Sequence, residues 1–339
     1  MHNLKQIRHR LYNRFALKAN RGSIGIGLIG IGGWGATNAI SIMKSTRFSI
    51  NGVYDIHEEL ARKFASRYNT KWYCNLTELL ADPGIEAVCI TVPNPFHKDL
   101  VLAAADAGKH IFIEKPLASH SEECRGIGQY CTNKQVVLQV GHQMRWEPVF
   151  QLMKQQIENG RMGRPLFAQG TYTMDRRGRD DWRQDPKLCP GGSMEQLGVH
   201  LLDVLFYLLG QPTEAKGRTM DLHHCSDKAE WNNVILSFPG QVRANISTSF
   251  SCPQYMRLEI FFEQGWMATN GNRIYVSVKD RKTEKHRPRG KKGSISQFIE
   301  FANCIENGER PEVGACQAEI IMRTVQSIHS TCESEDLKQ

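Results

Sequence analysis

The sequence has no apolar run long enough to cross a membrane. Spanning a bilayer takes about 20 consecutive apolar residues, whereas the longest apolar stretch, residues 199–209, is short and contains His200 and Asp203. The sequence also lacks the apolar core of a secretory signal. We therefore expect a protein without a membrane span, located in the reducing cytoplasm.

The spacing typical of metal sites is missing as well. The ten cysteines form no C-x-x-C pair, which is the spacing of zinc sites and redox motifs. The nearest approach to a ligand set is His223-His224-Cys225, which is too small a group for a structural metal. We expect free thiols and no metal site.

Acidic residues are scarce in two segments. Residues 1–22 carry six Lys or Arg and no acid, and residues 281–293 carry seven against one Glu. Because the net charge is +8 and these segments together hold +12, the remaining chain has a charge of −4. Binding to nucleic acid or anionic lipid is one interpretation. We favour a solvated tail and a solvated loop, and we expect no nucleic-acid partner.

The basic N-terminal segment allows a second interpretation of location. Leu4, Ile7, Leu11 and Phe15 fall on one helical face with basic residues around it. A basic amphipathic start without acids is typical of organellar transit peptides. We favour a helical extension of a cytoplasmic enzyme, and organellar import stays open as the alternative.

The most constrained stretch is residues 24–35, IGIGLIGIGGWG. Its aliphatic start predicts a short buried strand, and the G-x-G-x-x-G that follows precedes a predicted helix. In that setting Gly30 permits a tight turn, Gly32 lets backbone N–H groups approach a pyrophosphate, and Gly35 lets helix and strand pack closely. The pattern predicts a dinucleotide site; a glycine-rich turn without a ligand is the alternative.

Asp55 indicates which dinucleotide binds. It ends the next predicted strand, INGVYD, 20 positions after Gly35, where a carboxylate can accept hydrogen bonds from a ribose diol. The same negative charge repels a 2′-phosphate, and no Lys or Arg follows Asp55 immediately. The sequence therefore favours NAD as the cofactor, with NADP as the alternative.

The two halves of the 339-residue chain differ in pattern. Strands alternate with helices in residues 23–143, which predicts an α/β domain with a doubly wound parallel sheet after the basic extension 1–22. Residues 144–339 contain six strand-like runs with one helix, residues 193–209, among them. Successive strands predict an α+β domain on an open, mostly antiparallel sheet. Since few helices remain to cover this sheet, we expect a homodimer or homotetramer formed through it.

Several short motifs occur in a specific order. They are the three glycines, VPN at 92–94 with His97, AGKH at 107–110, Glu114-Lys115-Pro116, DDWRQDP at 180–186 and GGSMEQLGVHLLD at 191–203. From about residue 24 to the last helix the chain resembles the Gfo/Idh/MocA oxidoreductases. The resemblance implies a Rossmann domain followed by an α+β domain. It also implies NAD(P)-dependent hydride transfer between nicotinamide and a secondary alcohol of a sugar, cyclitol or sugar derivative.

Lys115 is the first catalytic candidate. It follows the apolar strand HIFIE and therefore emerges at the carboxyl end of the sheet, where α/β proteins bind ligands. Oxidising an alcohol needs a base for the hydroxyl proton, and a lysine near a positive nicotinamide has a lowered pKa. A surface lysine is equally consistent with the residues alone; the resemblance implies the active site.

His200 and Gln196 complete the catalytic set that the resemblance implies. His200 lies on an apolar helix face, where a core histidine is the ordinary outcome, but the family places its acid–base histidine here. Gln196 stands where many members carry Asp, and an amide cannot accept a proton. It is therefore expected to bind a substrate hydroxyl, unless Glu195 substitutes as the carboxylate. Asp203, on the same helix face, could fix the His200 tautomer.

The other site residues follow from position and resemblance. The cofactor-binding set is Gly30, Gly32, Gly33, Trp34, Gly35, Asp55, Pro93, Asn94, His97, Glu114 and Lys115. The substrate-binding set is Arg145, Tyr172, Trp182, Arg183, Gln196 and His200, with Arg176 and Arg177 nearby. Arginines beside a tryptophan would suit a sugar that carries phosphate, nucleotide or carboxylate groups, and an exposed charged loop is the alternative.

Two other functions stay open at this point. Some relatives implied by the resemblance are NAD-dependent glycoside hydrolases, which oxidise the sugar only transiently, and some are dinucleotide-binding sensors or regulators without catalysis. If the protein is such a hydrolase, no NADH should accumulate. If it is a sensor without catalysis, Lys115 or His200 should be replaced by another residue, but both are present.

Overall fold

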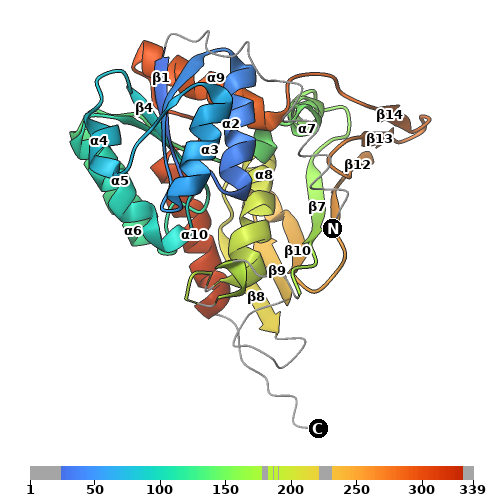
Figure 1. Cartoon of the computed structure of the whole chain (residues 1–339). Coiled ribbons are helices and arrows are strands. Elements are labelled where there is room, and N and C mark those ends of the chain that lie inside the picture. Colours follow the sequence, from blue (N-terminus) through green and yellow to red (C-terminus); the bar gives the residue numbers. More distant parts are fainter. Residues whose placement is uncertain (1–23, 178–181, 186, 190, 221–230, 331–339) are drawn as a thin grey trace.

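The computed structural model of the chain describes residues 24–177, 182–185, 187–189, 191–220 and 231–330. The basic extension 1–22 and the group at 223–225 lie outside these residues. Two sheets with their covering helices make up the molecule (Figure 1). None of the described helices combines the length and apolar character that crossing a membrane requires.

The first sheet has six parallel strands in the order β3-β2-β1-β4-β5-β6. The strands are β1 (Ile24–Ile29), β2 (Phe48–Tyr54), β3 (Lys71–Trp72), β4 (Ala87–Ile90), β5 (His110–Ile113) and β6 (Leu138–Val140). The helices between them are α2 (Gly33–Ser45), α3 (Glu58–Tyr68), α4 (Leu76–Ala81), η1 (Asn94–Phe96), α5 (His97–Asp106) and α6 (Ser121–Asn133). The predicted doubly wound sheet is confirmed, and its strand order reverses between β1 and β4, where such sheets bind ligands.

A helix from the far end of the chain covers part of this sheet. α9 (Gly293–Asn307) packs beside α2 on one face (Figure 1). Its Phe301 stacks on Phe48 with ring centroids 5.7 Å apart, and its Phe298 lies 4.3 Å from Phe112. The domain division predicted at residue 143 stays a prediction, but α9 contributes to the core of the first sheet.

The second sheet has eight strands in the order β14-β13-β12-β11-β7-β10-β9-β8, and only the β7–β10 pair is parallel. The strands are β7 (Pro165–Thr173), β8 (Glu214–Met220), β9 (Trp231–Ser237), β10 (Arg243–Ser249), β11 (Tyr255–Phe262), β12 (Gly265–Thr269), β13 (Ile274–Val278) and β14 (Glu284–His286). The predicted open, mostly antiparallel sheet is confirmed. The sequence pattern predicts six of these strands. It does not predict β12 and β14, which are short and directly follow turns.

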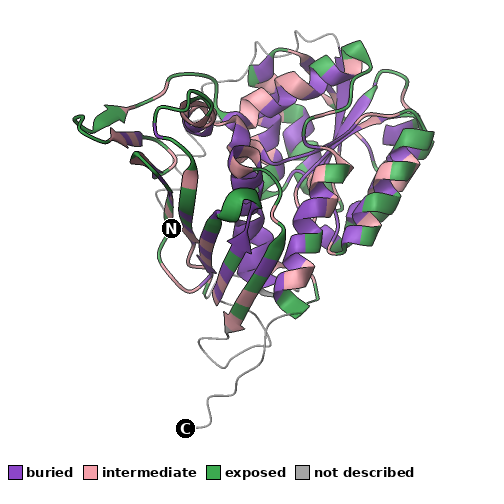
Figure 2. Ribbon diagram, turned by 180° about the vertical axis from the view of Figure 1, so that it is seen from behind, coloured by how far each residue is buried: buried purple, intermediate pink, exposed green. Residues whose placement is uncertain are grey.

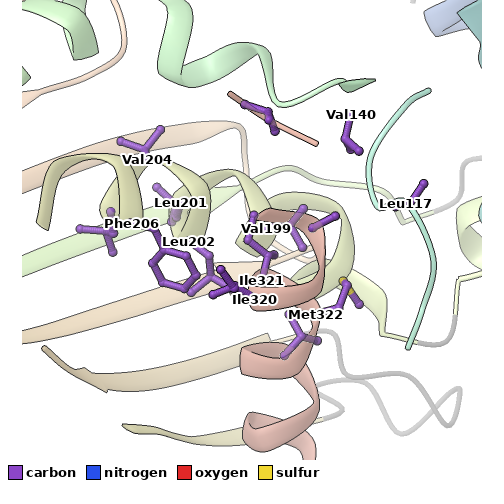
Figure 3. Close-up of a cluster of buried hydrophobic side chains, with 14 of the residues drawn as sticks. Leu117, Val140, Val199, Leu201, Leu202, Val204, Phe206, Ile320, Ile321 and Met322 are labelled. Atoms are coloured by element: carbon purple, nitrogen blue, oxygen red, sulfur yellow. The ribbon is translucent and has the colours of Figure 1, made fainter. Parts of the chain in front are cut away.

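The remaining elements lie between and around the two sheets. They are η2 (Gln143–Trp146), α7 (Pro148–Glu158), η3 (Trp182–Gln184), the π-helical turn η4 (Met194–Gly198), α8 (Val199–Leu209), η5 (Pro239–Gln241) and α10 (Ala315–Ser330). α8 and α10 meet in a buried cluster that includes Leu202, Phe206 and Ile321 (Figure 3). α8 also lies on the second sheet, since a Cβ atom at Gly170 would be 3.4 Å from Leu201.

None of the described elements covers the opposite face of the second sheet, which we call its bare face. Exposed and buried residues alternate along its strands (Figure 2). Phe167 and Phe261 stack on this face with ring centroids 5.9 Å apart and are 36% and 37% exposed. Ile235 is 57% exposed. The inner residues of the same strands are buried, so the sheet has one covered and one uncovered side.

Candidate active site

The glycine-rich turn after β1 leaves space at the N-terminus of α2. A Cβ atom at Gly30 would lie 2.4 Å from the carbonyl oxygen of Thr91, and one at Gly35 would lie 2.3 Å from that of Gly30. At Gly32 and Gly33, by contrast, an added Cβ meets no described atom within 4 Å. No acid lies in the first turn of α2, and no side chain in the described ranges caps it. Its N–H groups therefore suit a dinucleotide pyrophosphate.

Asp55 follows β2 and connects the end of this strand to the glycine-rich turn. Its Oδ2 accepts a hydrogen bond from the backbone N–H of Ile31 at 2.8 Å, and its Oδ1 accepts one from that of His57 at 2.9 Å. A carboxylate has about four acceptor positions, so both oxygens can still receive ribose hydroxyls. The ribose contact stays a prediction that this geometry allows.

Glu114 and Trp34, 80 positions apart in the sequence, are in direct contact. Glu114 Oε1 accepts hydrogen bonds from Trp34 Nε1 at 2.7 Å and from Asn38 Nδ2 at 2.8 Å. Burial raises the pKa of the Glu114 carboxyl, and these donors oppose the shift. Two predicted cofactor residues thus come together at the start of α2, where Glu114 fixes the position of the indole.

The loop after β4 holds Pro93, Asn94 and His97. The ring of His97 is fully buried, and its Nδ1 and Nε2 lie 2.8 and 3.0 Å from the carbonyl oxygens of Pro116 and Val92. These contacts brace the loop against the segment after β5, and the predicted cofactor contact of His97 stays a prediction. Pro93 starts η1, and the buried Asn94 has an Nδ2 without a hydrogen-bond partner among the described residues.

Lys115 lies at the carboxyl edge of the first sheet, directly after Glu114. Its Nζ donates a hydrogen bond to the backbone oxygen of Gln196 at 2.9 Å. Burial lowers the pKa of Lys115 to about 8; the positive charges of Arg183 and Arg176 add to the decrease, and Glu114 opposes it. A lysine with this pKa is partly neutral at physiological pH and can accept a proton.

His200 stands at the start of α8, after the π-helical turn that carries Gln196. Its ring centroid lies 6.2 Å from that of Tyr172 on β7. Burial, together with the positive charge of Lys115, lowers the pKa of His200 well below its usual value, so the imidazole is neutral. Lys115, Gln196, His200 and Tyr172 therefore form one group, and their predicted catalytic and substrate-binding roles stay predictions.

The predicted substrate loop divides into two parts. Arg183 Nε donates to Gln196 Oε1 at 3.3 Å, and the Arg183 guanidinium lies 4.4 Å from the centroid of the Trp182 ring. Arg177 instead pairs with Asp175 at 2.9 Å, and both side chains are largely exposed. Arg183 and Trp182 border the catalytic group, whereas Arg177 lies on a solvated part of the loop.

Arg145 and Asp203 have a different role from the predicted one. The Arg145 guanidinium donates to both carboxylate oxygens of Asp203, at 2.5 and 3.1 Å, and to Glu312 at 2.9 Å. Arg145 is 3% exposed and Asp203 is fully buried. Arg145 is thus part of a buried ion pair, its predicted substrate contact stays a prediction, and no hydrogen bond joins Asp203 to His200 among the described residues.

Two further residues belong to the group around Lys115. His142 follows β6 after Gly141, and its ring centroid lies 6.3 Å from that of His200. The sequence interpretation missed it; a histidine at the carboxyl end of a predicted parallel strand is the signal, because these ends converge at one edge of the sheet. Glu195 is buried, and burial raises the pKa of its carboxyl to about 7 against the effect of Lys115.

Four buried polar atoms of this group lack a hydrogen-bond partner in the part of the chain that the structure describes. They are His142 Nδ1, Glu195 Oε2, Gln196 Nε2 and His200 Nδ1. A buried polar atom without a partner lowers the stability of the fold by about 1–3 kcal/mol. A ligand with polar groups would pair with these atoms and remove this penalty. Among the described residues no cluster of three His, Cys, Asp or Glu could hold a metal ion.

Comparison with known proteins agrees with this geometry. Residues 24–142 match the oxidoreductase family model with an NAD-binding Rossmann fold, and residues 150–268 match the GFO/IDH/MocA C-terminal domain. D-xylose 1-dehydrogenase (NADP(+)) 2 of Haloferax volcanii is 26% identical over 91% of this chain and 97% of its own length. The scyllo-inositol 2-dehydrogenase (NAD(+)) of Bacillus subtilis is 26% identical over 78% of this chain and 79% of its own. Levoglucosan dehydrogenase, solved with NADH and levoglucosan, shares the fold with a TM-score of 0.84 at 21% identity, over 91% of this chain and 96% of that one.

Proposed function

The chain belongs to the Gfo/Idh/MocA oxidoreductase family, and we propose that it transfers a hydride between NAD(P) and a secondary alcohol of a sugar, cyclitol or sugar derivative. The observation that carries this proposal is the position of Lys115. Its amine, with a pKa of about 8, lies at the carboxyl edge of the sheet, near polar atoms of Gln196 and His200 that have no hydrogen-bond partner among the described residues. The xylose and inositol dehydrogenases among its relatives act on alcohols of this class.

Each part of the site has a task in this reaction. Gly32, Gly33 and the N-terminus of α2 would hold the pyrophosphate, and Asp55 would hold the ribose. When bound, the nicotinamide supplies the hydride acceptor. Neutral Lys115 accepts the hydroxyl proton while its bond to the Gln196 carbonyl keeps Nζ in place. His200, which is neutral, binds and orients the reacting hydroxyl.

The direct test is NADH absorbance of the purified protein with NAD or NADP and a panel of sugars, inositols and sugar nucleotides. A substrate-dependent rise in absorbance supports the proposal and identifies the alcohol. NAD is expected to be preferred, because the Asp55 carboxylate repels a 2′-phosphate. No rise with any compound, while calorimetry shows intact NAD binding, would favour the NAD-dependent glycoside hydrolase or the dinucleotide sensor.

The proposed assembly is a homodimer or homotetramer formed through the bare face of the second sheet. The exposed Phe167, Phe261 and Ile235 support this assignment, because apolar area on an uncovered sheet is stabilised by a second surface. The proposed location is the cytoplasm, since the described cysteines are free and free thiols suit a reducing compartment.

A further inference from the structure

We propose that His142 is a substrate-binding residue, and that its imidazole and that of His200 together hold hydroxyl groups of an uncharged polyol. This inference rests on the proposed function and adds a specificity-determining residue to it. Lys115 and His200 were expected from the sequence, whereas His142 enters only through the arrangement of the strands.

The position of His142 places it at the reacting group. β6 lies next to β5 in the first sheet, with Val140 opposite Ile113, so the residues that follow these strands share one edge. His142 follows β6, and Lys115 follows β5. The two imidazole rings meet edge to face, with centroids 6.3 Å apart and planes at 80°. His142 is 2% exposed and His200 is 6% exposed.

The other buried histidines of the described chain show what a structural histidine looks like here. Both ring nitrogens of His97 lie within 3.0 Å of carbonyl oxygens. His110, which is partly buried, accepts a hydrogen bond on Nδ1 from the backbone N–H of Val137 at 3.0 Å. The Nδ1 atoms of His142 and His200, in contrast, are buried with no partner in the described ranges. A purely structural role does not account for this difference.

The charge state of the pair indicates an uncharged ligand group. Burial and the positive charges of Arg145 and Lys115 lower the pKa of His142 to about 4, although Asp203 opposes the decrease. A neutral imidazole offers one donor and one acceptor. A hydroxyl group has the same two functions and can pair with either nitrogen, whereas a carboxylate or phosphate only accepts. The pair therefore suits hydroxyl groups on neighbouring carbons of a polyol.

The test uses the full-length protein preloaded with NADH, with scyllo-inositol, D-xylose and levoglucosan as probes in calorimetry. His142→Phe keeps an aromatic ring at this position and removes both nitrogens. We expect it to weaken polyol binding about tenfold or more, while NADH affinity and melting temperature stay close to those of the wild type. His142→Gln should recover part of the loss, because an amide can donate and accept. His329→Gln, which removes an exposed histidine elsewhere, should bind polyol normally.

The outcomes separate this inference from the proposed function. Wild-type protein that binds a polyol and forms no NADH would overturn the dehydrogenase and leave the His142 assignment in place if His142→Phe loses that binding. Wild-type turnover with an unchanged KM in His142→Phe would overturn the His142 assignment alone. A wild-type protein that binds none of the three probes, or a His142→Phe variant that loses NADH and polyol equally, also overturns it.

Discussion

The carboxyl edge of the first sheet and the bare face of the second sheet are incomplete in opposite ways. At the edge, hydrogen-bonding atoms such as His200 Nδ1 and Gln196 Nε2 are buried without partners among the described residues. On the face, the rings of Phe167 and Phe261 are more than one third exposed. A small polar ligand satisfies the first kind of deficit, and only a second apolar surface satisfies the other. The comparison thus separates the proposed substrate site from the proposed subunit contact.

Removing the Lys115 amine from the carboxyl edge should have the largest effect on turnover. Lys115→Ala is expected to lower turnover about 10³-fold, because the hydroxyl proton then has no positioned acceptor. NADH binding, measured by calorimetry, should be retained. Near-normal turnover in this variant would contradict the assignment of Lys115 as the base.

The opposite end of the same strand provides the matched control. Lys109 precedes β5 and donates from Nζ to the backbone oxygen of Asp82 at 3.0 Å. It is also nearly buried, and burial lowers the pKa of its amine. Lys109→Ala should cost stability without a comparable loss of turnover. Equal losses of turnover in the two variants would show that burial of a lysine, and not its place at the carboxyl edge, sets the effect.

The ion pair beside the edge should affect stability more than chemistry. Arg145→Met leaves the buried Asp203 carboxylate without its partner, which is expected to lower the free energy of unfolding by about 3–5 kcal/mol. Arg125 pairs with Glu319 at 3.1 Å on the surface, and Arg125→Met should cost less than about 1 kcal/mol. Urea denaturation measures both. If Arg145→Met lowers the free energy of unfolding only slightly, the ion pair is not the main role of Arg145, and a substrate contact is favoured instead.

Local pattern accounts for what was predicted, and long-range packing accounts for what was not. The turn at Gly30 and the strand before Lys115 are local signals, and the predicted dinucleotide site and the predicted position of Lys115 follow from them. The pairing of Arg145 with Asp203 joins positions 58 apart, and the contact of α9 with Phe48 joins positions farther apart still. His142 was missed although it stands at the carboxyl end of a predicted strand, because the sequence does not show that its ring nitrogen lacks a partner among the described residues.

The pH profile tests the electrostatics of the edge. Because the neutral form of Lys115 is the base and its pKa is about 8, the rate of alcohol oxidation should rise about tenfold per pH unit at low pH and level off above about 8. The positive charge of Arg183 helps to lower this pKa, so Arg183→Gln should move the rising limb to higher pH. A limb that stays in place would exclude Lys115 as the titrating group.

Substitution of Asp55, at the dinucleotide-binding part of this edge, should have a smaller effect. Asp55→Ala is expected to weaken NAD binding about tenfold through loss of the ribose hydrogen bonds, and to weaken NADP binding less, because a repulsive charge is removed too. Asp55→Asn is the control, since its amide oxygen can still accept from the backbone N–H of Ile31. Calorimetry with both nucleotides gives the comparison. Equal losses for NAD and NADP would refute the ribose contact.

The bare face should yield the smallest change in activity. Phe261→Glu places a charge in the middle of the apolar stack with Phe167, and burying an unpaired charge between subunits is costly. Light scattering is expected to show the assembly falling to single chains, while turnover stays within about twofold because the edge lies in the other sheet. Leu60→Glu is the control, because Leu60 is 39% exposed on α3 beside the first sheet. This substitution should leave the mass of the assembly unchanged.

If the wild type is already a single chain, exposed apolar rings on this face do not mark a subunit contact. If Phe261→Glu abolishes turnover, the two incomplete regions are coupled and not independent.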